Sequence, residues 1–225
     1  MKKITLIALL GMSSLLFSQA NTIGLNSAGG THEVFFKIKS EGAGRALNYD
    51  EIIGSPYLNK NFSIAKVADD YEKAPVRYNT LRDEIEFQKN GTTLALPKEE
   101  KFSRIEIFSP KTILVSLDTQ DDLNGYFFEL VNDKTGLYKK IQTKFIDAVP
   151  AANSYATDRP ASFKTLDPVY YIKTESGYIK KPKKIKDIAN AFPAKKDDIE
   201  KFAKSNNIKV NKEEDLIKLV KFLNQ

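Results

Sequence analysis

Hydrophobic and polar residues alternate in short runs through most of the chain, which is the pattern of half-buried β-strands. Residues 83–88 and 92–96 are two such runs, separated by Asn90-Gly91. Asn-Gly favours a two-residue hairpin turn because both central turn positions need a positive φ. Two further hairpins are predicted over 126–141 and 169–181, each around a turn that contains glycine. Additional strands are expected at residues 34–38, 62–67, 75–78, 104–108 and 112–117.

After Pro182 the apolar residues recur every three or four positions, which is the period of an amphipathic helix. Three short helices are predicted, and Asn211 is placed to cap the third. The sequence therefore predicts a mainly β fold with a C-terminal helical segment, built as an antiparallel sandwich or a partly open barrel. We expect a β-rich domain over 33–181 and a short basic helical appendage over 183–225.

The first twenty residues have the pattern of a secretory signal peptide. Lys2 and Lys3 precede an apolar run that ends in small residues near Ala20. The alternative, a membrane anchor, would need roughly 20 apolar residues, and this run is shorter and interrupted. Cleavage after residue 20 would leave a flexible leader over 21–32 and no transmembrane segment. The expected location is therefore outside the cytoplasm, in the periplasm, at the cell surface or in the medium.

The net charge of +6 belongs to the C-terminal end of the chain. Residues 177–225 hold 13 lysines against 7 acidic residues, whereas residues 21–176 are slightly acidic. A basic patch can attract a polyanion or a membrane surface, although alternating lysines and acids also make an ordinary solvated helix. The slightly acidic body argues against nucleic acid as a partner.

The composition excludes several classes of active site. The chain has no cysteine and a single histidine, His32, so thiolate chemistry and multi-histidine zinc sites are excluded. A Ser-His-Asp triad would depend on His32, which lies in the expected leader and lacks a rigid support. Glu84 and Glu86 share one face of a predicted strand, which we interpret as a polar strand face. We therefore predict no catalytic residue and no cofactor.

Two segments hold candidate binding residues. Asp118, Asp121, Asp122 and Asn124 concentrate oxygen ligands before a glycine, as a calcium loop does, but their spacing is not that of an EF-hand. Such residues also dominate ordinary turns, so no metal site is predicted there. Aromatic and cationic residues that could grip a glycan, a peptide or another polymer lie within or beside a long connection over 149–168; they are Tyr155, Tyr170, Tyr171, Tyr178, Lys173 and Lys180.

Three short stretches resemble a group of exported proteins of flavobacteria and related Bacteroidetes-type bacteria. They are Gly54-Ser55-Pro56-Tyr57-Leu58, Pro75-Val76-Arg77-Tyr78-Asn79 and Asp83-Glu84-Ile85-Glu86-Phe87. The resemblance implies export in a Gram-negative cell, and it implies no activity and no catalytic residues. It also suggests that Arg77 and Asp83 form a structural ion pair.

Three functional hypotheses follow. The first is an exported, non-enzymatic binding or structural protein whose partner is an envelope polymer, a peptide or another envelope protein. The second is a carboxylate-dependent hydrolase or lyase acting on glycans or other envelope polymers, which would need two acids opposed across a cleft. The third is a polyanion or membrane-surface binder that uses the lysine-rich tail.

Overall fold

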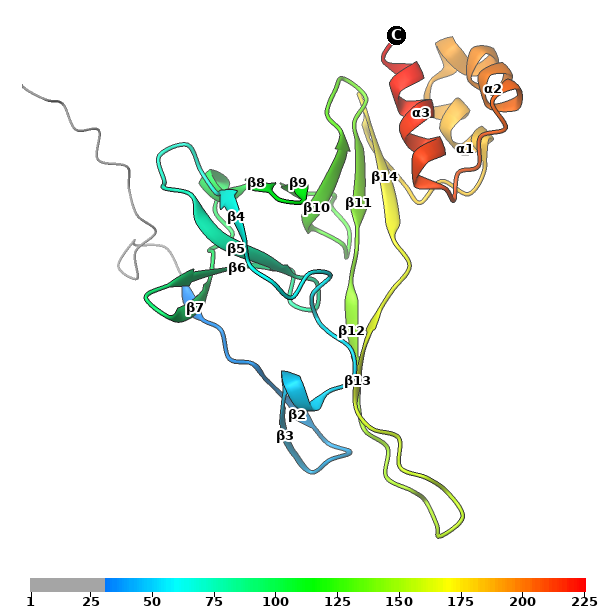
Figure 1. Cartoon of the computed structure of the whole chain (residues 1–225). Coiled ribbons are helices and arrows are strands. Elements are labelled where there is room, and N and C mark those ends of the chain that lie inside the picture. Colours follow the sequence, from blue (N-terminus) through cyan, green and yellow to red (C-terminus); the bar gives the residue numbers. More distant parts are fainter. Residues whose placement is uncertain (1–30) are drawn as a thin grey trace, which may run out of the picture.

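The computed structural model describes residues 31–225, and most of the residues in its strands belong to one antiparallel β-sheet (Figure 1). The predicted signal peptide and nearly all of the predicted leader lie outside the described residues. Eleven strands form the sheet in the order β1-β7-β6-β5-β4-β8-β9-β10-β11-β14-β15. Two smaller sheets pair β2 with β3 and β12 with β13. The strands are β1 His32–Glu33, β2 Lys37–Ser40, β3 Arg45–Asn48, β4 Ser63–Lys66, β5 Ala74–Asn79, β6 Glu84–Lys89, β7 Thr92–Ala95, β8 Arg104–Phe108, β9 Lys111–Leu117, β10 Gly125–Val131, β11 Leu137–Lys140, β12 Thr143–Ile146, β13 Ser162–Thr165, β14 Val169–Thr174 and β15 Gly177–Lys180.

The predicted hairpin at Asn90-Gly91 is confirmed. β6 and β7 pair in the register that sets Lys89 opposite Thr92, so the turn holds two residues. Asn90 and Gly91 have φ values of +50° and +78°, the left-handed conformation that this turn requires. The predicted hairpins β10–β11 and β14–β15 also form. In contrast, residues 34–36 are not a strand, because β2 begins at Lys37.

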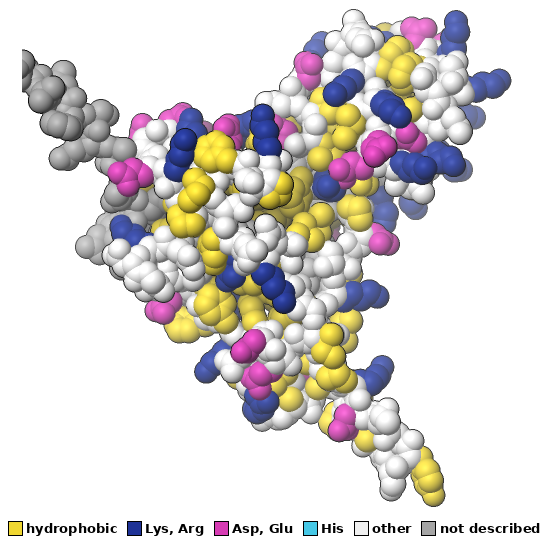
Figure 2. Space-filling view, in the orientation of Figure 1, with side chains coloured by type: hydrophobic (Ala, Val, Ile, Leu, Met, Phe, Trp, Pro, Cys, Tyr) yellow, Lys and Arg dark blue, Asp and Glu magenta, His cyan; other side chains and the backbone are white. Residues whose placement is uncertain are grey.

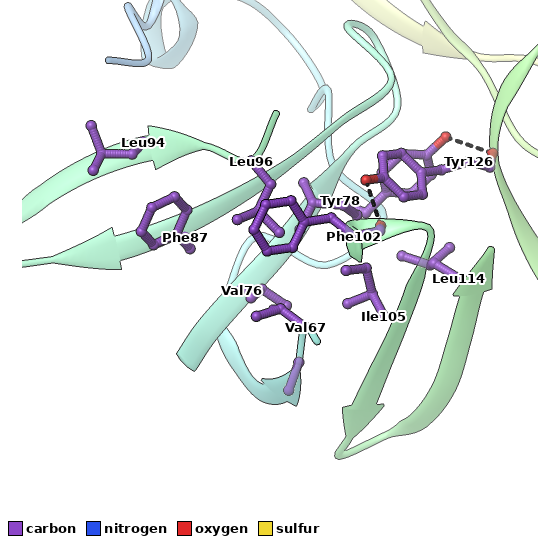
Figure 3. Close-up of a cluster of buried hydrophobic side chains, with 12 residues drawn as sticks. Val67, Val76, Tyr78, Phe87, Leu94, Leu96, Phe102, Ile105, Leu114 and Tyr126 are labelled. Atoms are coloured by element: carbon purple, nitrogen blue, oxygen red, sulfur yellow. Dashed lines mark hydrogen bonds between the residues drawn. The ribbon is translucent and has the colours of Figure 1, made fainter. Parts of the chain in front are cut away.

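The sheet curls over its main hydrophobic core but does not close. Figure 3 shows side chains from β4 to β10 meeting inside the curl, with the Tyr126 hydroxyl donating to the Phe102 carbonyl at 3.0 Å. β1 and β15 remain as separate edges, so the fold is a large open antiparallel sheet rather than a closed barrel. The fully buried members of this core include Val67, Val76, Ile85, Phe87, Leu94, Leu96, Phe102, Ile105, Leu114 and Tyr126.

The helical segment packs against one end of the sheet. It consists of α1 Ile185–Ala191, α2 Lys196–Ser205 and α3 Glu213–Leu223. Their apolar faces share one buried cluster with Leu137 of β11 and Ile172 of β14. The fold class, mainly β with a C-terminal helical segment, is therefore confirmed. The predicted cap is wrong: residue Lys212 occupies the N-cap position, where no side chain caps the helix.

Residues 143–165 form a ribbon that projects from the body, which we call the arm (Figure 1). β12 and β13 pair along its base, and Val149 and Arg159 exchange backbone hydrogen bonds of 2.8 and 2.9 Å farther out. Residues 149–160 are all exposed. The sequence pattern predicts a long connection over 149–168. In the structure this range contains β13 and the outer part of the arm.

The base of the arm is anchored by the hairpin β2–β3. The Asp147 carboxylate accepts hydrogen bonds from the Ser40 hydroxyl and from the backbone N–H groups of Glu41 and Gly42. A Cβ on Gly42 would lie 1.7 Å from the Ala148 carbonyl oxygen, so this close approach needs glycine. The base of the arm is therefore fixed to the body, while its tip is surrounded by solvent.

Candidate binding site

The predicted tyrosine and lysine residues do not form one surface. Tyr171 is fully buried, and its hydroxyl donates to Asp121 at 2.8 Å. Tyr178 packs beside it with ring centroids 6.3 Å apart. Lys180 lies over the ring of Tyr171 and forms ion pairs with Asp121 and Asp122 at 3.2 and 2.8 Å. Burial and the hydrogen bond to Asp121 raise the pKa of Tyr171 to about 12. This group belongs to the core and its edge.

The other predicted binding residues point elsewhere. The Tyr170 hydroxyl donates to Glu213 of α3 at 3.0 Å, which ties the sheet to the helical segment. Lys173 is exposed on β14. Tyr155 lies at the tip of the arm and is 100% exposed. The long connection therefore does not cover Tyr170 or Tyr171, since it extends away from the sheet that holds them (Figure 1).

The oxygen-rich segment 118–124 is a self-bonded turn. Asp118 accepts from the Gln120 N–H, and the Asn124 side-chain oxygen accepts from the N–H and hydroxyl of Thr119. Burial opposes ionisation of Asp121, but hydrogen bonds from Leu123, Tyr171, Thr119 and Lys180 outweigh it and lower its pKa to about 2. Asp122 is paired with Lys180. Among residues 31–225 no group of three or more histidine, cysteine or acidic side chains could hold a metal ion.

A different site, which the sequence analysis did not identify, lies between β5, β6 and the segment before β4. Its centre is Glu86, which is 0% exposed and accepts hydrogen bonds from Arg77 Nε at 2.7 Å and from the Asn79 amide at 2.7 Å. The Tyr57 hydroxyl lies 3.0 and 3.1 Å from the two carboxylate oxygens. We call Tyr57, Arg77, Asn79 and Glu86 the Arg77 cluster. The interpretation of Glu86 as part of a polar strand face is wrong, because these partners cover it completely.

Aromatic rings hold the Arg77 guanidinium in place. Its central carbon lies 3.9 Å from the ring centroid of Tyr57, 4.4 Å from that of Phe62 and 5.5 Å from that of Phe36. Guanidinium groups stack favourably on such faces. Burial and the nearby Glu86 charge raise the pKa of Tyr57 well above its usual value, so its hydroxyl stays protonated. The cation is therefore fixed in one orientation.

Two adjoining cavities open above this cluster, with volumes of about 420 and 180 Å³. Tyr49, Asp50, Tyr57 and Arg77 line both of them, and we call the combined space the Arg77 hollow. Phe36 lines the larger cavity. The space-filling view shows exposed hydrophobic side chains across the middle of the visible face, while Lys and Arg side chains gather around the helical segment (Figure 2).

A second buried ion pair lies near the first, and it corrects the suggested pairing of Arg77 with Asp83. Lys140 Nζ lies 2.7 Å from Asp83 and also donates to the Tyr126 carbonyl at 2.9 Å. Asp83 further accepts from the Tyr78 hydroxyl at 2.6 Å. A Cβ on Gly125 would lie 1.7 Å from an Asp83 oxygen, so glycine permits this approach. We call Tyr78, Asp83, Tyr126 and Lys140 the Asp83 cluster.

One signal in the sequence does point to the Arg77 cluster. The short stretches 54–58, 75–79 and 83–87 supply Tyr57, then Arg77 with Asn79, then Glu86. They are well separated along the chain and meet in this cluster. His32, by contrast, belongs to β1, where its side chain is half exposed and lies 3.4 Å from Glu84.

Comparison with protein-family models, with curated proteins and with solved structures finds no match for this chain. Within residues 31–225, no helix is long and apolar enough to cross a lipid bilayer.

Proposed function

We propose that this chain is an exported, non-enzymatic binding protein whose ligand occupies the Arg77 hollow. The observation that carries the proposal is a guanidinium that is held rigidly while some of its N–H donors have no partner. Arg77 has five N–H donors, and three of them bond to Glu86, Tyr57 and the Lys60 carbonyl. The other two have no partner among the described residues. The Arg77 side chain is 13% exposed, at the floor of the hollow.

The surroundings suit recognition of a ligand. Binding sites typically combine aromatic walls with a few fixed polar groups, because fixed groups lose little conformational freedom when the ligand binds. The Arg77 hollow offers the rings of Phe36, Tyr49 and Tyr57 together with the Asp50 carboxylate. Asp50 has no hydrogen-bond partner among residues 31–225, so it is free to accept from a ligand.

The position of Glu86 favours binding over carboxylate-dependent hydrolysis. A hydrolase needs two acids that face each other across the substrate. Glu86 is fully buried beneath Arg77, and its two oxygens are occupied by Tyr57, Arg77 and Asn79. Its role in this proposal is to hold the guanidinium, while Asp50 is the acid that reaches the ligand.

The proposal is tested by titrating the isotope-labelled protein with mixtures of small polar compounds, namely neutral and acidic oligosaccharides, dipeptides, dicarboxylates and nucleotides. We expect at least one mixture to shift the amide resonances of residues around the hollow, and Arg77→Lys to abolish those shifts. Arg159→Met, on the exposed arm, is the matched control and should leave them unchanged. Shifts confined to other parts of the protein, or no shifts at all, would contradict the proposal.

A further inference from the structure

We infer that the ligand of the Arg77 hollow is a short run of pyranose units of a neutral glycan. This inference rests on the proposed function and adds to it the class of ligand.

One wall is an aromatic ring that solvent reaches. Phe36 lines the larger cavity and is 38% exposed, whereas Tyr57 is 9% exposed and carries the Arg77 guanidinium over its ring. A pyranose ring has one face made mostly of C–H groups, which packs well against an aromatic ring. Rigid aromatic side chains give such contacts at a low cost in conformational entropy. Phe36 therefore offers a sugar ring an aromatic surface at the edge of the hollow.

The polar groups are mixed in kind. Arg77 offers two N–H donors, and Lys60 lines the smaller cavity, whereas the Asp50 carboxylate accepts only. A sugar hydroxyl both donates and accepts, so one ring can engage the donors and the acceptor together. A simple anion would use the donors but would leave Asp50 without a partner and be repelled by its charge. The balance of charges therefore favours a neutral ligand.

The shape indicates an extended ligand. The two cavities share four lining residues, so they lie next to each other. The larger cavity, of about 420 Å³, is bounded by Phe36 and Asn48, and the smaller by Ser55 and Lys60. An oligosaccharide can place one unit in the larger space and a neighbouring unit in the smaller.

The experiment is a titration of the intact protein with maltotriose, cellotriose and tri-N-acetylchitotriose, compared with trigalacturonate, succinate and a dipeptide. We expect a neutral trisaccharide to shift the amides of Phe36, Asp50 and Tyr57 in a saturable way. Phe36→Ala and Asp50→Asn should each weaken its affinity about ten-fold. Both residues are at the surface, and thermal unfolding of each variant will show whether the fold is kept.

The outcomes separate the inference from the proposed function. Phe108→Ala, at an exposed phenylalanine of β8 outside the hollow, is the control and should bind as the unmodified protein does. Saturable shifts at the hollow only with trigalacturonate, succinate or the dipeptide would overturn the glycan inference and leave the binding function standing. Trisaccharide binding that neither Phe36→Ala nor Asp50→Asn weakens would also overturn it. If none of these compounds shifts the amides at the hollow, the glycan inference is overturned. If none of the wider set of mixtures does so either, nucleotides included, the binding function is overturned as well.

Discussion

Two buried ion pairs lie on either side of the β5–β6 hairpin, and they differ in how many hydrogen-bond donors of the cation remain without a partner. In the Arg77 cluster, Arg77 pairs with Glu86 at 2.7 Å. In the Asp83 cluster, Lys140 pairs with Asp83 at the same distance. Each carboxylate also accepts from a tyrosine hydroxyl, that of Tyr57 or of Tyr78. The chemical ingredients are therefore nearly the same.

The cation makes the difference. Lys140 is 2% exposed, and its ammonium is enclosed by Asp83, the Tyr126 carbonyl and the face of Phe127. Arg77 has a planar fork of five donors, so it can hold Glu86 with one edge and still present N–H groups to the hollow. A buried ion pair by itself is thus weak evidence for a binding site. The evidence is stronger where the cation keeps unpaired donors beside an open cavity.

The largest effect is expected from Glu86→Gln. Removing this charge leaves the Arg77 guanidinium buried without a counter-ion, which typically costs about 3–5 kcal/mol of unfolding free energy. Urea unfolding followed by tyrosine fluorescence measures it. Glu41→Gln, at an exposed ion pair with Lys39, is the control and should change stability by less than about 0.5 kcal/mol. A loss below about 1 kcal/mol for Glu86→Gln would mean that the cluster contributes little to folding.

A smaller loss is expected from Lys140→Met, which breaks the second pair. Asp83 would keep Lys98 at 3.2 Å and the hydrogen bonds from Tyr78 and from the Tyr126 N–H. Its charge is therefore less isolated than that of Arg77 in Glu86→Gln, and we expect a loss of about 2 kcal/mol. The same urea experiment tests the order of the two variants. If Lys140→Met were the more damaging, the closed pair would be the main electrostatic support of the sheet.

Local patterns predicted the hairpins correctly because turn chemistry and alternation are properties of neighbouring residues. Asn90-Gly91 and the alternation around Ile85 and Phe87 needed no knowledge of the rest of the chain. The same alternation assigned Glu86 to a polar face, since nothing local shows that Tyr57 folds over it. The arm was missed for a similar reason: β12 and β13 pair across the whole connection between them. Both errors have the same cause. Contacts between residues far apart in the sequence bury Glu86 and pair β12 with β13, and local propensity does not contain them.

Tyr57→Phe tests how much of the first pair depends on its hydroxyl. Glu86 would retain Arg77 and Asn79, so we expect a loss of about 1 kcal/mol of unfolding free energy. Tyr78→Phe is the matched variant in the second cluster, where the hydroxyl serves both Asp83 and the Tyr126 carbonyl. We expect Tyr78→Phe to cost more than Tyr57→Phe. Equal losses would indicate that the two clusters are equally well supported.

The smallest expected effect is a change of stability with pH, and it comes from Lys140. Burial lowers the pKa of Lys140 below its ordinary value, and the Asp83 charge only partly opposes this. Between the lowered pKa and about 10.5, the unfolded chain therefore binds more protons at this site than the folded protein. The Lys140 contribution to stability must then rise with pH in that window.

The free-energy difference between the unmodified protein and Lys140→Met should widen as the pH is raised from neutral towards 10.5. The tyrosines largely cancel in this difference because both proteins contain them. Urea unfolding of the two proteins at a series of pH values measures it, and a difference that narrows over this range would show that the buried ammonium is stabilised rather than penalised by its surroundings.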